Sequence, residues 1–269
     1  MLGLGLATGL AVQGKNSVTA AAHDVHPSHI VGYRTLGKTE LKISDISFGS
    51  SRSADPDLVR YALERGVTFF DTAESYRFGA SEKAMGEALR GVRKEVVLSS
   101  KTKASSTAKH HQIMDALEGS LRRLQTDYVD IYYNHAVNDV GRLRNDEWRE
   151  FCFKAKEQGK IRFNGISGHG KRLVECLGHV IEEESVDVIL TAYNFGQDPD
   201  FLSRLKQSLH FTYVQPGLPP VLKKAHDRGI GVIAMKTLMG ARRSDMESYE
   251  RGGGTFSQAA FRKIRVYHV

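Results

Sequence analysis

Residues 67–102, VTFFDTAESYRFGASEKAMGEALRGVRKEVVLSSKT, contain two apolar runs with an amphipathic segment between them. The runs 67–73 (VTFFDTA) and 94–102 (KEVVLSSKT) are short and rich in β-branched or aromatic residues, as strands are. The segment 80–91 (ASEKAMGEALRG) has helical spacing and ends at a glycine. This order of strand, helix and strand predicts two parallel strands joined by a crossover helix.

The same order repeats along the rest of the chain. Further strands are predicted at 43–50, 127–135, 161–167, 186–194 and 230–236, and further helices at 55–66, 106–125, 146–160, 171–184 and 219–229. The strands are apolar enough to be covered on both faces, which is typical of a parallel sheet. A hairpin is predicted at 33–44 (YRTLGKTELKIS), with its turn near Gly37 and Lys38.

Polar residues stand where four consecutive strands end: Asp71, Lys101, His135 and Ser167. In a closed barrel these ends share one mouth, where the active site lies. In an open doubly wound sheet they spread along an edge and converge less well. The α/β pattern therefore favours a TIM-type (β/α)8 barrel.

Asp71, Tyr76, Lys101 and His135 form a set with a recognisable chemistry. A lysine ammonium beside a phenol favours the phenolate, and a carboxylate keeps that lysine charged and in place. A histidine opposite can orient a substrate oxygen. The set is suited to protonating a carbonyl oxygen while a hydride arrives at carbon.

Each residue also has a purely structural interpretation. Asp71 could cap a turn, Tyr76 could be a rim aromatic, and Lys101 could be a solvated strand end. His135 alone is more often a hydrogen-bonded structural residue than a catalyst. Their placement on successive strand ends favours the chemical interpretation.

The stretches FFDTAESY (69–76), VVLSSKT (96–102) and DYVDIYYNH (127–135) resemble signatures of the aldo-keto reductases. The resemblance runs from about Tyr33 to about Gln258, and it implies that the hairpin closes the bottom of the barrel. It also implies that the four residues of the set above form the family's catalytic tetrad and that NADP(H) is the hydride cofactor.

The resemblance extends to the cofactor contacts. SFGSS implies that Gly49, Ser50 and Ser51 approach the ribose or nicotinamide side of the cofactor. In GISGHG, Ser167 matches the serine that bonds the carboxamide, whereas Gly168 stands where the family usually has asparagine.

Two further positions depart from the family pattern. Leu190 stands where a glutamine is common. Met235 stands where an aromatic residue often stacks on the nicotinamide, and Lys236 follows it, as in some branches of the family.

The charge of the chain indicates which classes of ligand it binds, and its cysteines indicate their oxidation state. The net charge of +7 favours anionic ligands, but basic residues are interspersed with acidic ones instead of forming a stripe. A phosphate-bearing small molecule is therefore predicted, and nucleic acid is not. The carbonyl or alcohol substrate is implied by the four-residue set and by the resemblance. Cys152 and Cys176 lie in helical stretches and are predicted to be buried free thiols, with a single disulfide as the alternative.

The amino-terminal residues 1–32 are predicted to lie outside the barrel domain, which is assigned to 33–269. MLGLGLATGLAV followed by TAAAH resembles a signal core and cleavage site, although no charged region precedes it. It is too short for stable membrane insertion. An exported or periplasmic location is expected if it is a signal, and a cytoplasmic one if it is a disordered tail. His23, His26 and His29 are interpreted as a solvated linker, with a metal site as the alternative.

The carboxyl-terminal stretch GGGTFSQAAFRKIRVYHV does not resemble the end of a complete barrel. The eighth strand and last helix are expected to be missing, through truncation or a frame shift. Two alternatives to an active reductase follow: an inactive barrel remnant that at most binds a ligand, and a metal-dependent hydrolase, which the sparse histidines and carboxylates at the strand ends disfavour. The substrate and the oligomeric state are not specified by the sequence.

Overall fold

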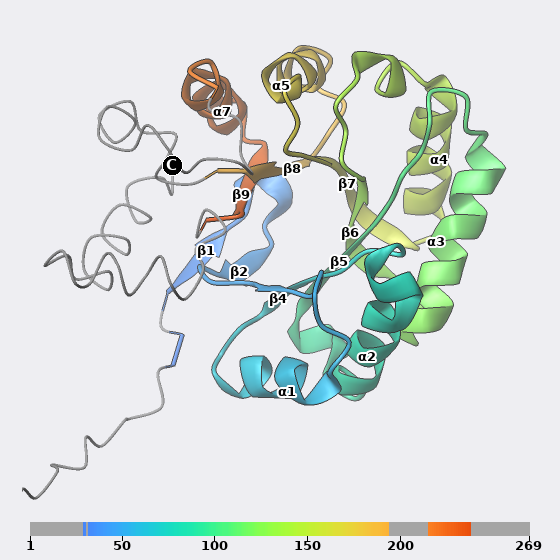
Figure 1. The fold of residues 1–269 in the computed structure, drawn as a ribbon, viewed down its shortest axis with the longest axis vertical. Coiled ribbons are helices and arrows are strands. Elements are labelled where there is room, and N and C mark those ends of the chain that lie inside the picture. Colours follow the sequence, from blue (N-terminus) through green and yellow to red (C-terminus); the bar gives the residue numbers. More distant parts are fainter. Residues whose placement is uncertain (1–28, 31, 194–214, 238–269) are drawn as a thin grey trace, which may run out of the picture.

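The chain is described by a computed structural model that covers residues 29–30, 32–193 and 215–237. A curled seven-stranded sheet runs in the order β3-β4-β5-β6-β7-β8-β9, and every neighbouring pair is parallel (Figure 1). The strands are β3 Phe48–Gly49, β4 Phe69–Asp71, β5 Val97–Thr102, β6 Val129–Asn134, β7 Ile161–Gly168, β8 Val188–Ala192 and β9 Gly231–Met235. Sequential strands in neighbouring positions are the arrangement predicted for a (β/α)8 barrel.

Helices line the outer, convex side of the curled sheet (Figure 1). They are α1 Pro56–Glu64, α2 Ala80–Ala88, α3 His110–Leu124, α4 Asp146–Glu157, α5 Leu173–Glu182 and α7 Leu218–Asp227. Local sequence sets their starts: the Asp55 side chain accepts from the Asp57 N–H before α1, and the Asn145 side chain accepts from the Glu147 N–H before α4. Every helix within the described ranges is too short or too polar to cross a membrane.

The predicted amino-terminal hairpin is confirmed. β1 (Tyr33–Thr35) pairs antiparallel with β2 (Lys42–Ser44), and a 3₁₀ turn at Gly37–Thr39 lies between them. The Lys38 N–H donates to the Gly229 carbonyl at 2.8 Å, just before β9. Gly37 has φ of +55°, and a Cβ there would lie 2.4 Å from the Gly229 carbonyl oxygen, so this contact requires glycine.

The strand predicted at 43–50 is split in the structure. Ile43 and Ser44 belong to the hairpin, and β3 comprises Phe48–Gly49 alone. The Ser44 N–H donates to the Thr68 hydroxyl at 2.9 Å, and the Ser44 hydroxyl accepts from the Thr68 N–H at 3.0 Å. These bonds anchor the end of β2 beside the start of β4, so the chain bends before β3 begins.

The core has an inner and an outer part. The inner face of the sheet packs alternate strand residues against hairpin residues, including Phe69, Val97 and Ile131 against Leu36 and Leu41. The hairpin therefore closes one end of the curled sheet. It contacts the starts of β4, β5 and β9, so the closed end is the amino end of the strands.

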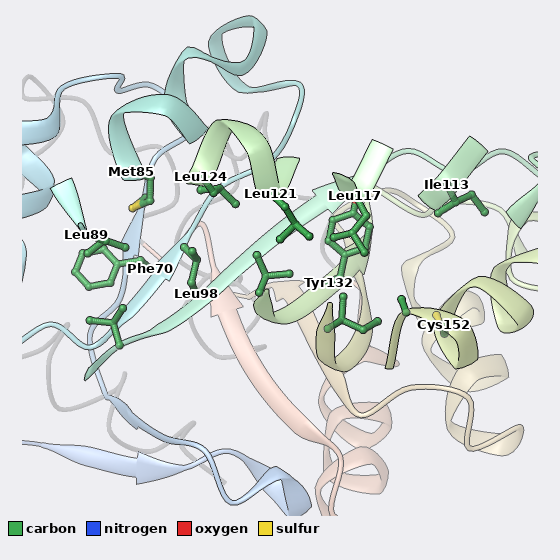
Figure 2. Packing of buried hydrophobic residues seen from close by; sticks show 14 of the residues in the cluster. Phe70, Met85, Leu89, Leu98, Ile113, Leu117, Leu121, Leu124, Tyr132 and Cys152 are labelled. Carbon is green, nitrogen blue, oxygen red and sulfur yellow. The ribbon is translucent and has the colours of Figure 1, made fainter. Parts of the chain in front are cut away.

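The outer face packs against the helices. Phe70, Leu98 and Tyr132 lie against Met85 and Leu117, which project from α2 and α3 (Figure 2). A separate cluster joins α5 and α7 to β7 and β8. Cys152 and Cys176 are buried in these two different clusters as free thiols, which confirms that prediction and excludes a disulfide between them.

Several predictions fall outside the described residues. They are the signal-like segment up to residue 28, His23 and His26, and the segment 238–269 in which an incomplete ending was expected.

Candidate active site

Asp71 and Lys101 form a buried ion pair at the carboxyl ends of β4 and β5. The Lys101 Nζ lies 2.6 Å from Asp71 Oδ2 and donates to the Thr72 carbonyl at 2.6 Å. The other oxygen, Asp71 Oδ1, accepts from the Ser99 hydroxyl at 2.6 Å. Lys101 is 1% exposed, and this burial lowers its pKa while the Asp71 charge opposes the shift. The lysine is thus fixed, and its charge depends on the aspartate.

Tyr76 lies over this pair in a turn that follows β4. The Lys101 Nζ is 4.9 Å from the centre of the Tyr76 ring, and the Tyr76 N–H donates to the Ala73 carbonyl at 3.0 Å. Burial, and secondarily the Asp71 charge, raise the pKa of Tyr76 well above its usual value. The expectation that this pKa falls toward neutrality is wrong for the chain alone, because burial of the phenol dominates. The phenol is therefore neutral and carries a proton that it can donate.

His135 completes the group at the end of β6. Its ring meets the Tyr76 ring edge to face, with centres 5.5 Å apart, and its backbone N–H donates to the Thr102 carbonyl at 2.8 Å. Burial lowers its pKa to about 3, with further contributions from the charges of Lys101 and Lys103. Within the described residues, His135 Nδ1 has no hydrogen-bond partner. A neutral imidazole keeps one N–H, which is suited to bonding a ligand oxygen.

Tyr76 is followed by an unusual backbone. Arg77 and Phe78 have φ of +52° and +56°, and Gly79 has φ of +84°. Left-handed conformations cost side-chain-bearing residues about 1–2 kcal/mol each. Phe78 is fully exposed. The turn that carries the predicted proton donor is therefore strained, which is common at functional sites.

The predicted cofactor residues on β3 and after it differ in their surroundings. Gly49 pairs in register with Asp71, and no atom lies within 4 Å of the place where its Cβ would stand. A ligand can therefore approach the backbone at Gly49. Ser50 is buried, and both its N–H and its hydroxyl donate to the Asp71 carbonyl at 3.0 Å, whereas Ser51 is exposed.

Ser167, Met235 and Lys236 lie at the ends of β7 and β9. Ser167 is buried, and its Oγ accepts from the Ala136 N–H at 3.0 Å, directly after His135. Met235 is partly buried against the inner cluster. Lys236 has φ of +59°, and burial lowers the pKa of its ammonium. These residues share the carboxyl end of the sheet with the other site residues, because all the strands are parallel.

Sequence reasoning missed three residues around this end of the sheet. Arg142 donates to the carbonyls of His135 and Ala136 at 3.0 and 3.1 Å and also bonds Asn134 Oδ1, so it fixes the end of β6. Lys103 and His169 contribute electrostatically to the lowered pKa of His135. Lys103 and His169 lie in loops and Arg142 ends a one-turn 3₁₀ helix (Val140–Arg142), where no periodic pattern indicates which side chains face the site.

Comparisons with known proteins fit this architecture. The family model described as the Aldo/keto reductase family matches residues 35–263. L-galactose dehydrogenase from Arabidopsis thaliana is 30% identical over 223 residues, which cover 76% of this chain and 65% of that protein. Methylglyoxal reductase YeaE from Escherichia coli is 41% identical over 118 residues, or 44% of this chain and 40% of that protein.

A solved structure of an aldo-keto reductase is also similar to this chain. The holo form of aldo-keto reductase AKR11C1 from Bacillus halodurans superposes with a TM-score of 0.59 at 26% identity, over 76% of this chain and 65% of that one. The chain thus spans less than two thirds of each of these three relatives.

Proposed function

The chain belongs to the aldo/keto reductase family of oxidoreductases, and from this premise we propose that it transfers hydride between NADPH and a carbonyl or alcohol substrate. The observation that carries the proposal is the convergence of four side chains at the carboxyl end of the sheet. A buried lysine–aspartate pair lies against the Tyr76 ring, and the neutral His135 ring meets the same tyrosine.

The residues present fit a nicotinamide cofactor. Gly49 offers open backbone, Met235 offers a partly buried apolar side chain, and Lys236 offers a positive charge for a phosphate group. Ser167 bonds the carboxamide in this proposal; its oxygen accepts from the Ala136 N–H, so its hydroxyl hydrogen is the group that donates to the ligand. When bound, NADPH supplies the hydride.

The side chains of this site supply the proton and hold the substrate. Tyr76 donates its phenolic proton to the substrate oxygen, because burial keeps the phenol neutral. The phenolate that forms is stabilised by the nearby Lys101 ammonium, which Asp71 keeps charged. Neutral His135 donates a hydrogen bond to the same substrate oxygen and orients it. In the oxidation direction, the phenolate takes the proton back.

Tyr76→Phe tests the proposal. Turnover is expected to fall about 100-fold or more, because the proton donor is lost. NADPH affinity, measured by fluorescence titration with NADH as the comparison, is expected to stay close to that of the parent chain. The matched control is Tyr61→Phe, at an exposed tyrosine on α1. Equal turnover in Tyr76→Phe and the parent would exclude Tyr76 as the acid.

The substrate screen for this experiment begins with the relatives. Two of them are named for acting on L-galactose and on methylglyoxal, so a sugar and a small oxoaldehyde are the first compounds to compare. A folded chain that binds NADPH but reduces no carbonyl compound would instead favour a binding role.

A further inference from the structure

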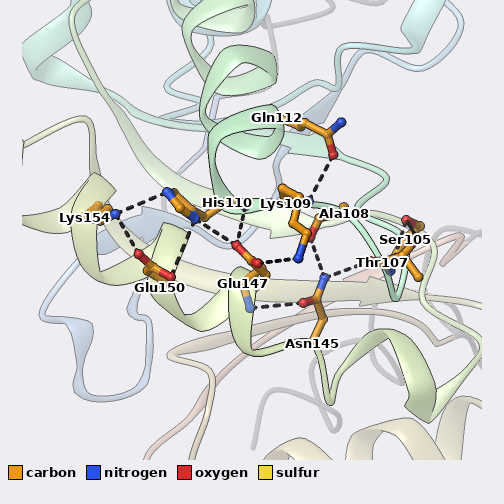
Figure 3. A network of polar contacts seen from close by, with 10 residues as sticks. All are labelled: Ser105, Thr107, Ala108, Lys109, His110, Gln112, Asn145, Glu147, Glu150 and Lys154. Atoms are coloured by element: carbon orange, nitrogen blue, oxygen red, sulfur yellow. Dashed lines mark hydrogen bonds and ion pairs between the residues drawn. The ribbon is translucent and has the colours of Figure 1, made fainter.

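Three potential metal-ligating groups converge on the outer helix layer, on elements separate from the proposed tetrad. His110 is the first residue of α3, and Glu147 and Glu150 lie near the start of α4 (Figure 3). His110 Nδ1 is 2.8 Å from Glu147 Oε2 and 3.5 Å from Glu150 Oε2. One ligand atom from each of the three residues lies within 4.8 Å of the others.

Contacts with the backbone fix Glu147 and the starts of the two helices. Glu147 Oε2 also accepts from the His110 N–H at 3.0 Å, so this carboxylate holds the start of α3. The Asn145 side-chain amide donates to the carbonyls of Ser105 and Ala108 at 3.0 and 2.9 Å, which ties the start of α4 to the loop before α3. His110 and Glu147 are therefore preorganised, whereas Glu150, whose side chain is 47% exposed, is held by its ion pair with Lys154.

Each carboxylate of the cluster already forms an ion pair with a lysine. Lys109 Nζ donates to Glu147 Oε1 at 2.8 Å, and Lys154 Nζ donates to Glu150 Oε1 at 2.6 Å (Figure 3). Lys154 Nζ also lies 3.2 Å from His110 Nε2. The two lysine side chains are 60% and 40% exposed, so each can move into water at small cost.

We propose that His110, Glu147 and Glu150 bind a divalent transition-metal ion such as Zn²⁺. A set of one imidazole nitrogen and two carboxylates suits such an ion, and water completes the coordination. Ligand atoms on a tetrahedral Zn²⁺ are about 3.3 Å apart for bond lengths near 2.0 Å, and the observed 2.8 and 3.5 Å lie on either side of that value. Zn²⁺ binds Nδ1 of the neutral ring that carries its proton on Nε2, so a proton on Nδ1 leaves to solvent and Nε2 takes one up from solvent. Lys154, which lies 3.2 Å from Nε2 and is bonded to Glu150, then moves away. The ion links α3 to α4.

Calorimetric titration of the purified 269-residue chain with Zn²⁺ tests the site. Circular dichroism monitors thermal unfolding in the same samples. His110→Ala and Glu150→Gln are each expected to weaken binding about tenfold or more. His111→Ala is the matched control, because His111 is the exposed neighbour on the same helix and should leave the affinity unchanged. Lys154→Met is expected to tighten binding by roughly twofold to fivefold, because it removes a competing cation. Parental Tm should rise with Zn²⁺, and an equal concentration of Mg²⁺ should not compete.

The amino-terminal histidines, His23, His26 and His29, are unchanged in every variant, so they contribute equally throughout. The proposal is overturned if the parent shows no saturable Zn²⁺ binding. It is also overturned if binding survives both His110→Ala and Glu150→Gln, which would assign the ion to the amino-terminal histidines. Competition by Mg²⁺, or weaker binding in Lys154→Met, would contradict the proposed ligand set. Glu150 is on the surface, so Glu150→Gln remains informative if His110→Ala does not fold.

Discussion

The two ends of the sheet each bury a carboxylate, and they differ in the cation beside it. Asp130, near the start of β6, accepts from Arg93 and Arg162 at 2.8 Å each and from the Leu98 N–H at 2.9 Å. Asp71, at the end of β4, is paired with Lys101. An arginine keeps its charge under all ordinary conditions, whereas a buried lysine can lose its proton.

The groups around Asp130 and Asp71 also differ in whether they can change protonation. Both Asp130 oxygens are bonded to permanent donors, so this group can only hold the strands together. The Asp71 end of the sheet has a neutral phenol, a histidine nitrogen without a partner in the described structure, and a strained turn. Of these two carboxylates, Asp71 is the one that lies beside groups able to change protonation. In a barrel the active site lies at the carboxyl end of the strands, so the proposed function predicts that the Asp71 end is the reactive one.

The largest effect on stability is expected from Asp130→Asn. Removing one charge from a buried pair leaves its partner uncompensated, and here Arg93 cannot lose its proton, so the free energy of unfolding should fall by about 3 kcal/mol. Asp71→Asn is the matched variant. Lys101 can lose its proton there, so this change should cost less stability but should reduce turnover strongly. Urea unfolding and carbonyl-reduction assays measure both quantities, and a larger stability loss in Asp71→Asn would break the comparison.

A smaller effect is expected from the protonation of His135. Burial and the neighbouring positive charges lower its pKa to about 3, from an ordinary value near 6.5. As the pH falls, the unfolded chain therefore takes up this proton before the folded chain does. The contribution of neutral His135 to the free energy of unfolding is complete above pH 6.5 and is lost as the pH falls toward 3. We expect the free energy of unfolding to fall by about 2 kcal/mol across that window. This is less than the full pKa difference would give, because the ring is partly exposed and solvent screens its charge.

His135→Gln should have a shallower dependence of unfolding free energy on pH between 6.5 and 4 than the parent. Leu58→Ala, at an exposed residue that does not titrate, should keep the parental slope. Identical slopes for His135→Gln and the parent would mean that His135 is not held neutral by the fold.

The sequence predicts the elements better than it predicts their electrostatics. Strands 94–102 and 127–135 are found within their expected ranges, because period and apolar composition report burial directly. The split at Ser44 depends on its paired bonds with Thr68, which are long-range contacts with no local signal. The placement of Asp71, Lys101 and His135 at one end of the sheet follows from parallel strands. The pKa direction of Tyr76 does not, because it depends on how deeply the folded chain buries the phenol and on its distance from Asp71.

The smallest effect is expected from relieving the strained turn beside Tyr76. Arg77 has φ of +52°, which glycine adopts without the steric cost of a side chain. Arg77→Gly should therefore raise the unfolding free energy by about 0.5 kcal/mol, after subtracting the greater flexibility that glycine gives the unfolded chain.

Gly79→Ala is the control of opposite sign for Arg77→Gly. Its φ is +84°, and an added Cβ would lie 2.8 Å from Arg123 Cδ, whose guanidinium is held at 2.6 Å by the buried carboxylate of Glu82. We expect this change to destabilise the chain by about 1–2 kcal/mol.

The Arg77→Gly variant also tests function, because the strained turn should position Tyr76 for the proposed reaction. Turnover should therefore fall in Arg77→Gly although stability rises, whereas higher stability with unchanged turnover would show that the strain has no part in the reaction.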